Sequence, residues 1–325
     1  LVAVPDIMIR PAPPPASAPL PPPTLDPCLD PPAPPAPTPL PPGLCPDVTE
    51  QPPAFSDSEI LTVQQALIRH CESQADRVAL LDPLPAASAA AIDPSRVLQW
   101  RQQFDSSFAA LYYPWLLVVD PLRLGGQLVR PIPPSGHVAG LIARTDLSLG
   151  VHVAPANSLL AWMQGFTEPV NEAWQGVLNP ASVNALRALP GRGFRVFGAR
   201  TVSSNSQLRF VNVRRTLLMI EKALELSLQW LVFEPNSDTL RQSISLTVAG
   251  FLTALWQRGA LVGAGPEEAF FVRCDAGNNP ADQVALGRLV IDVGVAIVRP
   301  AEFVVVRVGR TEDELTLTEL TGVVT

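Results

Sequence analysis

Between Ala269 and Arg310 the pattern of hydrophobic residues predicts three strands. The first spans Phe270 to Cys274, and a polar turn separates it from a long strand, Leu289 to Val298. Apolar residues occupy both faces of this long strand, which is typical of a strand inside a sheet with layers on either side. The third strand, Phe303 to Val308, is equally apolar and lies near the end of the sequence. Because a flat apolar edge promotes aggregation, we expect this strand to need a partner.

Helix and strand patterns alternate in the region before this stretch. Ser56 and Glu59 form a capping box, which predicts the start of an amphipathic helix. Arg77 to Asp82 has the pattern of a short buried strand, and a helix is expected from Asp93-Pro94 to about Leu111. Trp115 to Asp120 is a second candidate for a buried strand. This β-α-β order favours parallel pairing of the two strands and an α/β layer architecture.

Further elements follow in the middle of the chain. A helix is predicted from Val138 to Thr145 and a strand from Phe194 to Val202, whereas Ser158 to Asn184 fits no single pattern. Two long helices come next, from about Val211 to Phe233 and from Ser237 or Asp238 to Arg258. Their short connection favours antiparallel packing. We therefore expect an α/β fold with a mixed sheet flanked by helices, a Pro-rich irregular N-terminal segment and an extended C-terminal arm strand.

Composition divides the chain into unequal parts. It has 325 residues, enough for one large domain or two ordinary ones, and 37 of them are proline, concentrated before residue 54. Proline excludes regular helix and central strand, so residues 1–54 are expected to form an extended polyproline-II-like segment. A spacer or a surface-hugging arm is favoured over a ligand for a Pro-recognising domain. Residues 55–300 are then the predicted core, and residues 301–325 the C-terminal arm.

Charge and cysteine content limit the possible partners. The net charge of −7 argues against nucleic acid as a partner. The four cysteines form no CxxC motif and are too few for a disulfide framework, which favours a reducing compartment. No apolar run reaches the length of a membrane span, and no signal peptide is evident. The sequence lacks an initial Met, so we expect a trimmed chain or part of a longer product.

Residues that could carry chemistry are sparse. His70, His137 and His152 have no metal-ligand spacing, and no glycine cluster completes a phosphate-binding loop. Asp120 ends a predicted strand, but the proline that follows it indicates a turn. We therefore expect no catalytic residue, no metal and no cofactor, and a protein that is not an enzyme. The alternative is an α/β enzyme that uses Asp120 or the glycines at Gly263 to Gly265.

One predicted helix carries a concentration of basic residues, Arg214, Arg215 and Lys222. The simpler interpretation is a solvated face on which these residues pair with Glu221 and Glu225. The alternative is a docking surface for an acidic partner.

Four segments together resemble the contractile tail sheath family, found in myovirus tails, R-type bacteriocins and extracellular contractile injection systems. They are YYPWLLVVDP from Tyr112, PPSGHVAGLIARTDLSLGVHVAPAN from Pro133, LRFVNVRRTLLMIEKAL from Leu208 and GRLVIDVGVAIVRPAEFVVVRVG from Gly287. They occur in the family's order and span about residues 95–310. The family's N-terminal arm usually begins with a Tyr-Pro-Gly-like entry, which the Pro-rich segment here lacks.

The resemblance implies a structural subunit. Such subunits polymerise in sixfold helical rings around an inner tube, and a metastable extended lattice contracts to drive the tube through a target envelope. The implied partners are neighbouring copies of the chain, the inner tube protein, and baseplate and terminal cap proteins. Assembly in the bacterial cytoplasm, as part of a phage tail or a released tail-like particle, follows from the same resemblance. A low-copy adaptor at the baseplate or cap end is the alternative within the family.

The resemblance also points to two sets of contact residues. Strand donation to a neighbouring subunit is implied for Phe303, Val304, Val305, Val306, Arg307 and Val308. Contact with the inner tube is implied for a turn and helix that contain Asn278, Asn279, Asp282 and Arg288. Strand addition supplies main-chain hydrogen bonds, and head-to-tail contacts of this kind generate open helical assemblies.

Overall fold

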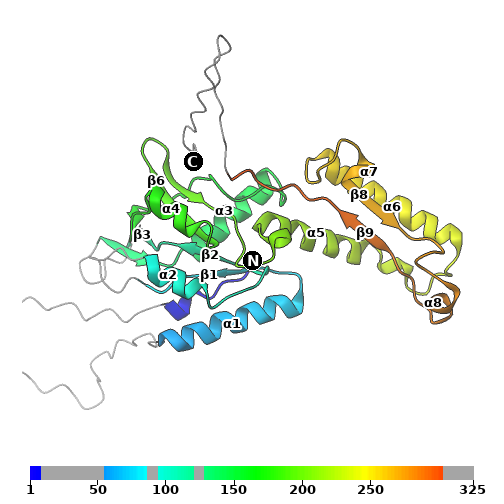
Figure 1. The fold of residues 1–325 in the computed structure, drawn as a ribbon, viewed down its shortest axis with the longest axis horizontal. Coiled ribbons are helices and arrows are strands. Elements are labelled where there is room, and N and C mark those ends of the chain that lie inside the picture. The colour runs from blue at the N-terminus through cyan, green and yellow to red at the C-terminus, as the bar shows by residue number, and fades with distance from the viewer. Residues whose placement is uncertain (9–54, 86–93, 121–127, 303–325) are drawn as a thin grey trace, which may run out of the picture.

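The computed structural model describes residues 1–8, 55–85, 94–120 and 128–302 (Figure 1). Within these ranges the α-helices are α1 (Asp57–Gln74), α2 (Pro94–Arg101), α3 (Ser135–Ser148), α4 (Glu172–Leu178), α5 (Val211–Ser227), α6 (Asp238–Gln257), α7 (Pro266–Ala269) and α8 (Ala281–Ala285). The strands are β1 (Ala79–Leu81), β2 (Ala109–Tyr113), β3 (Leu116–Val119), β4 (Val129–Ile132), β5 (Gly165–Phe166), β6 (Val183–Leu189), β7 (Gly193–Phe197), β8 (Phe270–Arg273) and β9 (Asp292–Val295). Sheets flanked by helices confirm the predicted α/β class.

A four-stranded mixed sheet forms the centre of the larger lobe. Its order is β1-β2-β6-β7, with the first three strands parallel and β7 antiparallel to β6. The expected parallel partner of β1 is therefore present, but it is β2 rather than Trp115 to Asp120. The predicted helix from Pro94 to Leu111 is wrong beyond Arg101, because Ala109–Tyr113 forms a strand. A short apolar run fits either period, and burial on both faces decides for the strand.

The strand β2 is covered on both faces. Leu111 and Tyr113 face a hydrophobic cluster that includes residues of α1, α2 and α4. Ala110 and Tyr112 face a second cluster formed with α3 and β3. All five residues of β2 are buried, and Leu111 and Tyr112 have no exposed surface. The larger lobe is thus a sheet between two covering layers, as parallel strands require.

A second, smaller sheet has the order β4-β3-β5 and is antiparallel throughout. Its middle strand β3 confirms the strand predicted at Trp115 to Asp120, but the parallel pairing expected for it is wrong. Only the first residue of β3 is buried. This sheet contributes Leu116 to the cluster below the central sheet, so it acts as part of a covering layer.

Both edges of the central sheet are covered by other parts of the chain. Val2 pairs with β1, donating from its N–H to the carbonyl of Val78 at 3.0 Å and accepting from Leu80 at 2.8 Å. A segment at Asn157 to Leu160 pairs with the outer edge of β7. Ile7 and Met8 are buried in the core. These first residues therefore differ from the extended segment predicted for residues 1–54, of which 9–54 lie outside the described residues.

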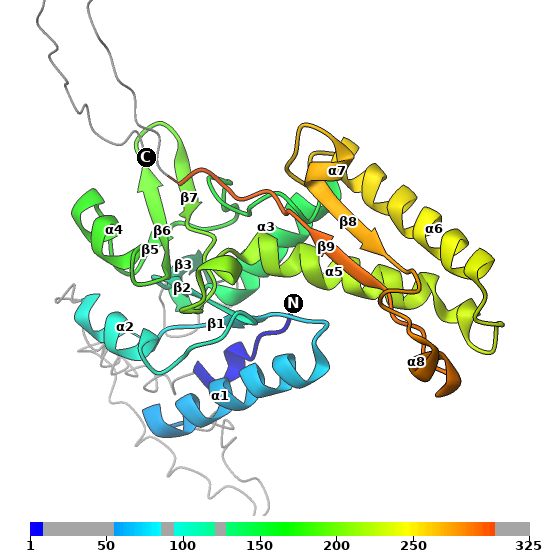
Figure 2. The same cartoon turned by 45° about the vertical axis from the view of Figure 1, so that its right-hand side comes forward.

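The smaller lobe contains α5 to α8 and the two-stranded ribbon β8–β9. The predicted long helices are present as α5 and α6, which run in roughly opposite directions in Figures 1 and 2. A third hydrophobic cluster joins Ile220 of α5 to Ile244, Val248 and Leu252 of α6. The first turns of α5 instead contact the larger lobe, so this helix connects the two lobes.

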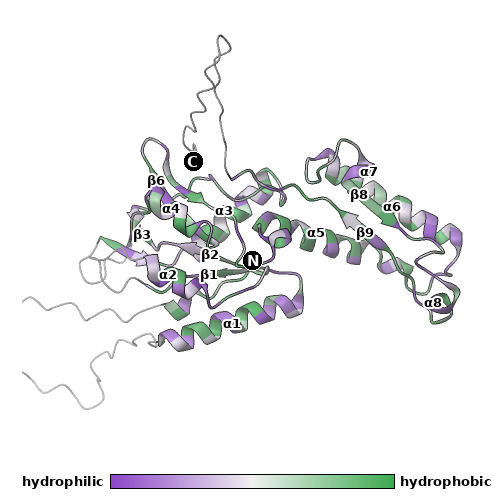
Figure 3. Ribbon diagram, in the orientation of Figure 1, coloured by the Kyte–Doolittle hydropathy of each residue, from purple (hydrophilic) through white to green (hydrophobic). Residues whose placement is uncertain are grey.

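The ribbon corrects the main expectation from the hydrophobic pattern. Of the predicted strand from Leu289 to Val298, Asp292–Val295 forms β9 and pairs with β8, and Ile297 adds an isolated antiparallel bridge to Leu261. Val293 and Val295 are half-buried against the third cluster, whereas Val290 and Ala296 are exposed. Burial inside a sheet with two covering layers is therefore wrong for this strand. Figure 3 shows mostly hydrophobic residues in β8 although the ribbon lies at the surface. None of the described helices is long and apolar enough to cross a membrane.

Candidate assembly surfaces and the arginine cleft

The chain returns from the ribbon to the larger lobe before residue 303. Val298 donates its N–H to the carbonyl of Ala260 at 3.1 Å and accepts from Asn212 Nδ2 at 3.1 Å. Arg299 then contacts Gln207, and Glu302 reaches Arg200. In Figure 2 this last described stretch ends beside β7, away from the ribbon. The predicted arm strand, Phe303 to Val308, lies outside the described residues.

A buried ion pair fixes the point where the chain leaves the described fold. The guanidinium of Arg200 donates from Nε to both carboxylate oxygens of Glu302, at 2.9 and 3.1 Å, and from Nη2 to Oε2. Its Nη1 donates to the carbonyl of Asn179 at 2.8 Å. The side chains of Arg200 and Glu302 are only 8% and 16% exposed. Such a bidentate pair fixes geometry more than it adds stability, because desolvation offsets much of the attraction.

The ribbon has free outer edges. In the described parts of the chain, no third backbone segment pairs with the outer edge of β8 or of β9. Phe271 is 60% exposed and its ring lies across Gly294 on the neighbouring strand, where any Cβ would overlap it. Unpaired N–H and C=O groups beside an apolar side chain are a template for another strand.

The residues predicted to contact the inner tube share the connection between β8 and β9, and two of them stabilise it. Asn278 donates from Nδ2 to the carbonyl of Arg273 at 2.8 Å and to Asp292 at 3.0 Å. Buried Asn279 donates to the carbonyl of Val290 at 2.9 Å and accepts from its N–H at 2.7 Å. These contacts explain why an Asn-Asn pair occurs in this turn.

The other two predicted tube-contact residues lie on the surface. Asp282 is exposed in the first turn of α8, and Arg288 is exposed after its end, with Nη1 donating to Gln283 Oε1 at 3.2 Å. Leu286 between them is 67% exposed. The structure therefore brings all four residues to one connection, but only Asp282 and Arg288 present their side chains to solvent.

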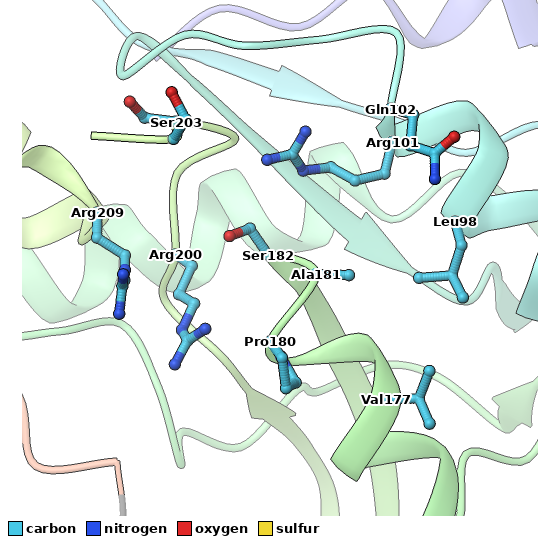
Figure 4. A pocket seen from close by; sticks show the side chains of 11 residues that line it. Leu98, Arg101, Gln102, Val177, Pro180, Ala181, Ser182, Arg200, Ser203 and Arg209 are labelled. Atoms are coloured by element: carbon cyan, nitrogen blue, oxygen red, sulfur yellow. The ribbon is translucent and has the colours of Figure 1, made fainter. Parts of the chain in front are cut away.

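A cleft of about 780 Å³ lies in the larger lobe, between α2, the end of α4 and the segment after β7. Three of its lining residues are arginines: Arg101, Arg200 and Arg209. Figure 4 shows Arg101 extending from α2 toward Ser182, while Arg200 and Arg209 lie near each other on another wall. We call this site the arginine cleft. Burial lowers the pKa of Arg101 from its usual value, and the charge of Asp105 opposes that shift.

Sequence reasoning missed this cleft. Its arginines are separated by up to 108 positions in the chain, from residue 101 to residue 209, and each sits in a different local pattern. Their positions in the sequence follow no regular spacing, because tertiary packing of α2 against the segment after β7 brings them together.

The basic residues on α5 are explained by contacts within the chain. Arg214 lies over the Phe108 ring, 3.9 Å from its centroid, and donates to Ser107 Oγ at 2.6 Å. Arg215 donates to both oxygens of Asp146 on α3. These contacts hold the start of α5 against the larger lobe, so for these two arginines the solvated face paired with Glu221 and Glu225 is wrong, and the alternative docking surface is not supported. Lys222 pairs with Glu225 at 2.8 Å, as expected for a solvated face.

Residues considered for chemistry lie apart. His70 is exposed beside Arg77, and Cys71 is buried, which raises the pKa of its thiol. Asp120 is buried and its N–H donates to the carbonyl of Leu128 at 3.0 Å. No group of three His, Cys, Asp or Glu residues in the described ranges is placed to hold a metal ion.

Two domain families match consecutive parts of the chain. Residues 54–202 match the phage tail sheath protein central domain, and residues 203–310 match the phage tail sheath C-terminal domain. The chain belongs to the phage tail sheath family. The border between the two matches falls just before α5, so the family's domains correspond closely to the two lobes.

Known structures and relatives agree with this assignment. A chain in the contracted helical sheath of the anti-feeding prophage is 32% identical, with a TM-score of 0.66 over 79% of this chain and 68% of that one. A chain in the sixfold-symmetrised baseplate of the same particle is 31% identical, with a TM-score of 0.67 over 80% of this chain and 67% of that one. A prophage major tail sheath protein of Pseudomonas aeruginosa is 26% identical over 78% of this chain. The chain spans less than two thirds of the length of the curated relatives it matches.

Proposed function

We propose that this chain is a structural subunit of a contractile sheath. It would polymerise with copies of itself in sixfold helical rings around an inner tube, within a phage tail or a tail-like injection particle assembled in the bacterial cytoplasm. Contraction from a metastable extended lattice would drive the tube through a target envelope. Two packings of the same subunit, separated by a barrier, would store the required energy in place of nucleotide hydrolysis.

The observation that carries this proposal is the free ribbon edge in a chain of the sheath family. The ribbon β8–β9 has two strands, whereas an isolated pair is marginally stable in water and gains from added strands. The segment Phe303 to Val308 has six residues, five of which are valine or phenylalanine. Adding it to a ribbon edge would satisfy outward-facing backbone groups and cover Phe271.

The position of the segment supports donation to a different copy. Arg200 holds Glu302 beside β7 in the larger lobe, while the ribbon lies in the smaller lobe (Figures 1 and 2). The described chain therefore ends, at Glu302, away from its own ribbon. Donation to the ribbon of a neighbour is a head-to-tail contact, and repetition of such a contact produces an open helix.

Contact with the inner tube is proposed for the exposed side of the β8–β9 connection, at Asp282 and Arg288. Asn278 and Asn279 would support this contact indirectly by holding the connection in shape. Terminal cap and baseplate proteins are proposed as the further partners at the ends of the sheath.

Deletion of residues 303–325 tests strand donation. The expected result is a folded subunit that forms no tubes by negative-stain electron microscopy when co-expressed with the tube protein. Replacing Val304 and Val306 together with lysine in the full-length chain is the matched control, because it keeps chain length but removes apolar contacts. Normal tubes in the deletion variant would refute the proposal.

A low-copy adaptor at the baseplate end is the second candidate. The similarity to a chain in the anti-feeding prophage baseplate structure favours it, because that match covers as much of this chain as the match to the helical sheath. Quantitative mass spectrometry of purified particles separates the two. A sheath subunit is expected in many copies per particle and in proportion to the tube protein, whereas an adaptor is expected in about one ring.

A further inference from the structure

The arginine cleft has more positively charged side chains than negatively charged partners for them. Among its lining residues are three arginines and no aspartate or glutamate. Glu302 compensates Arg200, which leaves Arg101 and Arg209. Asp105, whose charge acts on Arg101, already accepts from the N–H of Ser204 at 2.8 Å and from its hydroxyl at 2.7 Å. The cleft is therefore an electrostatic site for an anion.

The two remaining arginines have unused donors. Arg101 donates from Nη1 to the carbonyl of Phe104 at 2.6 Å, and its Nη2 makes no hydrogen bond to another described residue. No side-chain hydrogen bond or ion pair joins Arg209 to another described residue. A guanidinium without a charged partner can form charge-assisted hydrogen bonds with a carboxylate that enters the cleft.

The apolar part of the cleft indicates a peptide rather than a small inorganic anion. Leu98, Val177 and Pro180 line it beside the arginines, and Val177 is 48% exposed. A small anion leaves this surface in water. A segment in which acidic residues adjoin a leucine covers both parts of the cleft at once.

The chain itself contains such a segment within reach. Glu312, Asp313 and Glu314 are consecutive and are followed by Leu315. Glu302, which Arg200 holds at the wall of the cleft, precedes Glu312 by ten residues. Ten residues span at most about 35 Å. A tether of this length gives an effective concentration on the order of 1 mM, which favours the chain's own segment over that of another copy.

We propose that the arginine cleft binds the acidic run Glu312 to Glu314 of the same chain before assembly. Docking of this run shortens the free length of the arm and holds Phe303 to Val308 away from the ribbons of other copies. The second statement rests on the proposed function of the arm, whereas the first concerns the unassembled subunit alone. Release of the run, when a neighbour's ribbon pairs with the arm, then couples strand addition to growth of the lattice.

Tryptic release of the terminal peptide tests the docking. Trypsin cleaves after Arg310 and frees Thr311 to Thr325, which mass spectrometry quantifies in the dilute full-length protein. Arg209→Glu is expected to speed this release about tenfold, as for the loss of about 1.4 kcal/mol of docking free energy. Arg192→Glu, an exposed arginine outside the cleft, is the control and is expected to have no effect.

Neutralising the run by Glu312→Gln, Asp313→Asn and Glu314→Gln provides the other half of a double-mutant cycle. Rates are divided by those of synthetic peptides of the same sequence, because acidic residues next to Arg310 slow trypsin by themselves. Docking predicts the same acceleration from either set of changes and no further gain when they are combined. Equal, salt-independent release from wild type and both variants overturns the proposal.

The concentration dependence separates the chain's own cleft from that of a neighbour. Protection independent of protein concentration supports docking within one chain, whereas protection that rises with concentration contradicts it. Failure of the sheath proposal has a different signature: tubes persist after deletion of residues 303–325, while the protection of Thr311 to Thr325 in the unassembled full-length chain is unaffected.

Discussion

The central sheet and the ribbon β8–β9 differ in how their faces and edges are covered. Each contains strongly apolar strands, but β2 is buried on both faces and the sheet around it has its edges covered by Val2 and by residues 157–160. The ribbon is covered on one face, by α6, and its outer edges pair with no other described segment. Within the described residues, both edges of the central sheet are thus covered, whereas the outer edges of the ribbon are not.

The contrast shows in which lobe backbone groups of a sheet remain unpaired within the described chain. The larger lobe holds the folding core, so an open edge there risks pairing with the wrong strand. The smaller lobe is connected to it by α5, which contacts Ser107 and Asp146 at one end and the third cluster at the other. On the proposed function, a ribbon carried by this helix would gain strands from neighbours without disturbing the core.

Core truncation should have the largest effect and should separate the two regions. Leu111→Ala in β2 removes a fully buried side chain between two layers, and we expect unfolding free energy to fall by about 4 kcal/mol. Val293→Ala in β9 is the matched change in a half-buried strand, expected to cost about 1 kcal/mol. Urea denaturation of the unassembled subunits measures both. Equal losses would contradict the contrast between a closed sheet and an open ribbon.

The buried carboxyl of Asp82 should give the next largest effect. Burial raises the pKa of Asp82 to about 6. Its carboxylate accepts a hydrogen bond from the N–H of Ser135, at the start of α3, which opposes this shift. A folded-state pKa above the unfolded value of 3.8 means that stability falls as pH rises from about 4 to 6 and then stays low. Asp82→Asn removes this loss, so it should stabilise the subunit by about 3 kcal/mol at pH 7 and hardly at all at pH 4.

Thermal unfolding across this pH range checks the Asp82 prediction. Asp275 in the ribbon connection provides the contrast, because N–H groups of Gly277 and Asn278 lower its pKa. Its contribution to stability is present above the unfolded pKa and is lost as pH falls through the lower folded value. Identical pH profiles for wild type and Asp82→Asn would show that the buried carboxyl is not the cause.

Breaking the ion pair at the root of the arm should have an intermediate effect. Arg200→Met leaves Glu302 without a partner, but that carboxylate can turn toward solvent, so we expect a loss of about 2 kcal/mol instead of the larger cost of a fully trapped charge. The double variant with Glu302→Gln should lose little more than Arg200→Met alone. Chemical denaturation of the single and double variants gives the coupling energy, and strict additivity would argue against the pair.

A charge on the ribbon should have the smallest effect on stability and a large effect on assembly. Phe271→Lys places an ammonium group on the open ribbon, where the native ring is 60% exposed, so the unfolding free energy should change by only about 0.5 kcal/mol. Tube formation, counted by electron microscopy, should be lost. Leu246→Lys, at an exposed position on α6, is the control that should still assemble.

Local signals in the sequence were sufficient for many elements. The capping box at Ser56 is present, with Ser56 Oγ accepting from the N–H of Glu59 and the Glu59 carboxylate accepting from the N–H of Ser56. The helices at α5 and α6 begin where the pattern predicted them. Residue type and periodicity are enough here because capping and amphipathic burial act within a few turns of one helix.

Predictions failed where the answer depended on distant parts of the chain. Ala109–Tyr113 fits a helical stripe as well as a strand until both layers around it are known. The stretch from Leu289 to Val298 has the composition of a strand inside a larger sheet, but within the described residues it pairs with β8 and, by one isolated bridge, with Leu261. The arginine cleft combines residues 101, 200 and 209, and no local pattern indicates that they meet.

The sequence by itself determined the class of fold, most element positions, the sheath family resemblance and the apolar character of Phe303 to Val308. Each of these depends on residue type and short-range spacing. Only the tertiary structure decided which sheet is closed, which edge stays open, and where Glu302 is held by Arg200. These outcomes depend on which distant surfaces the folded chain brings together, because burial and pairing are properties of both partners and not of either segment alone.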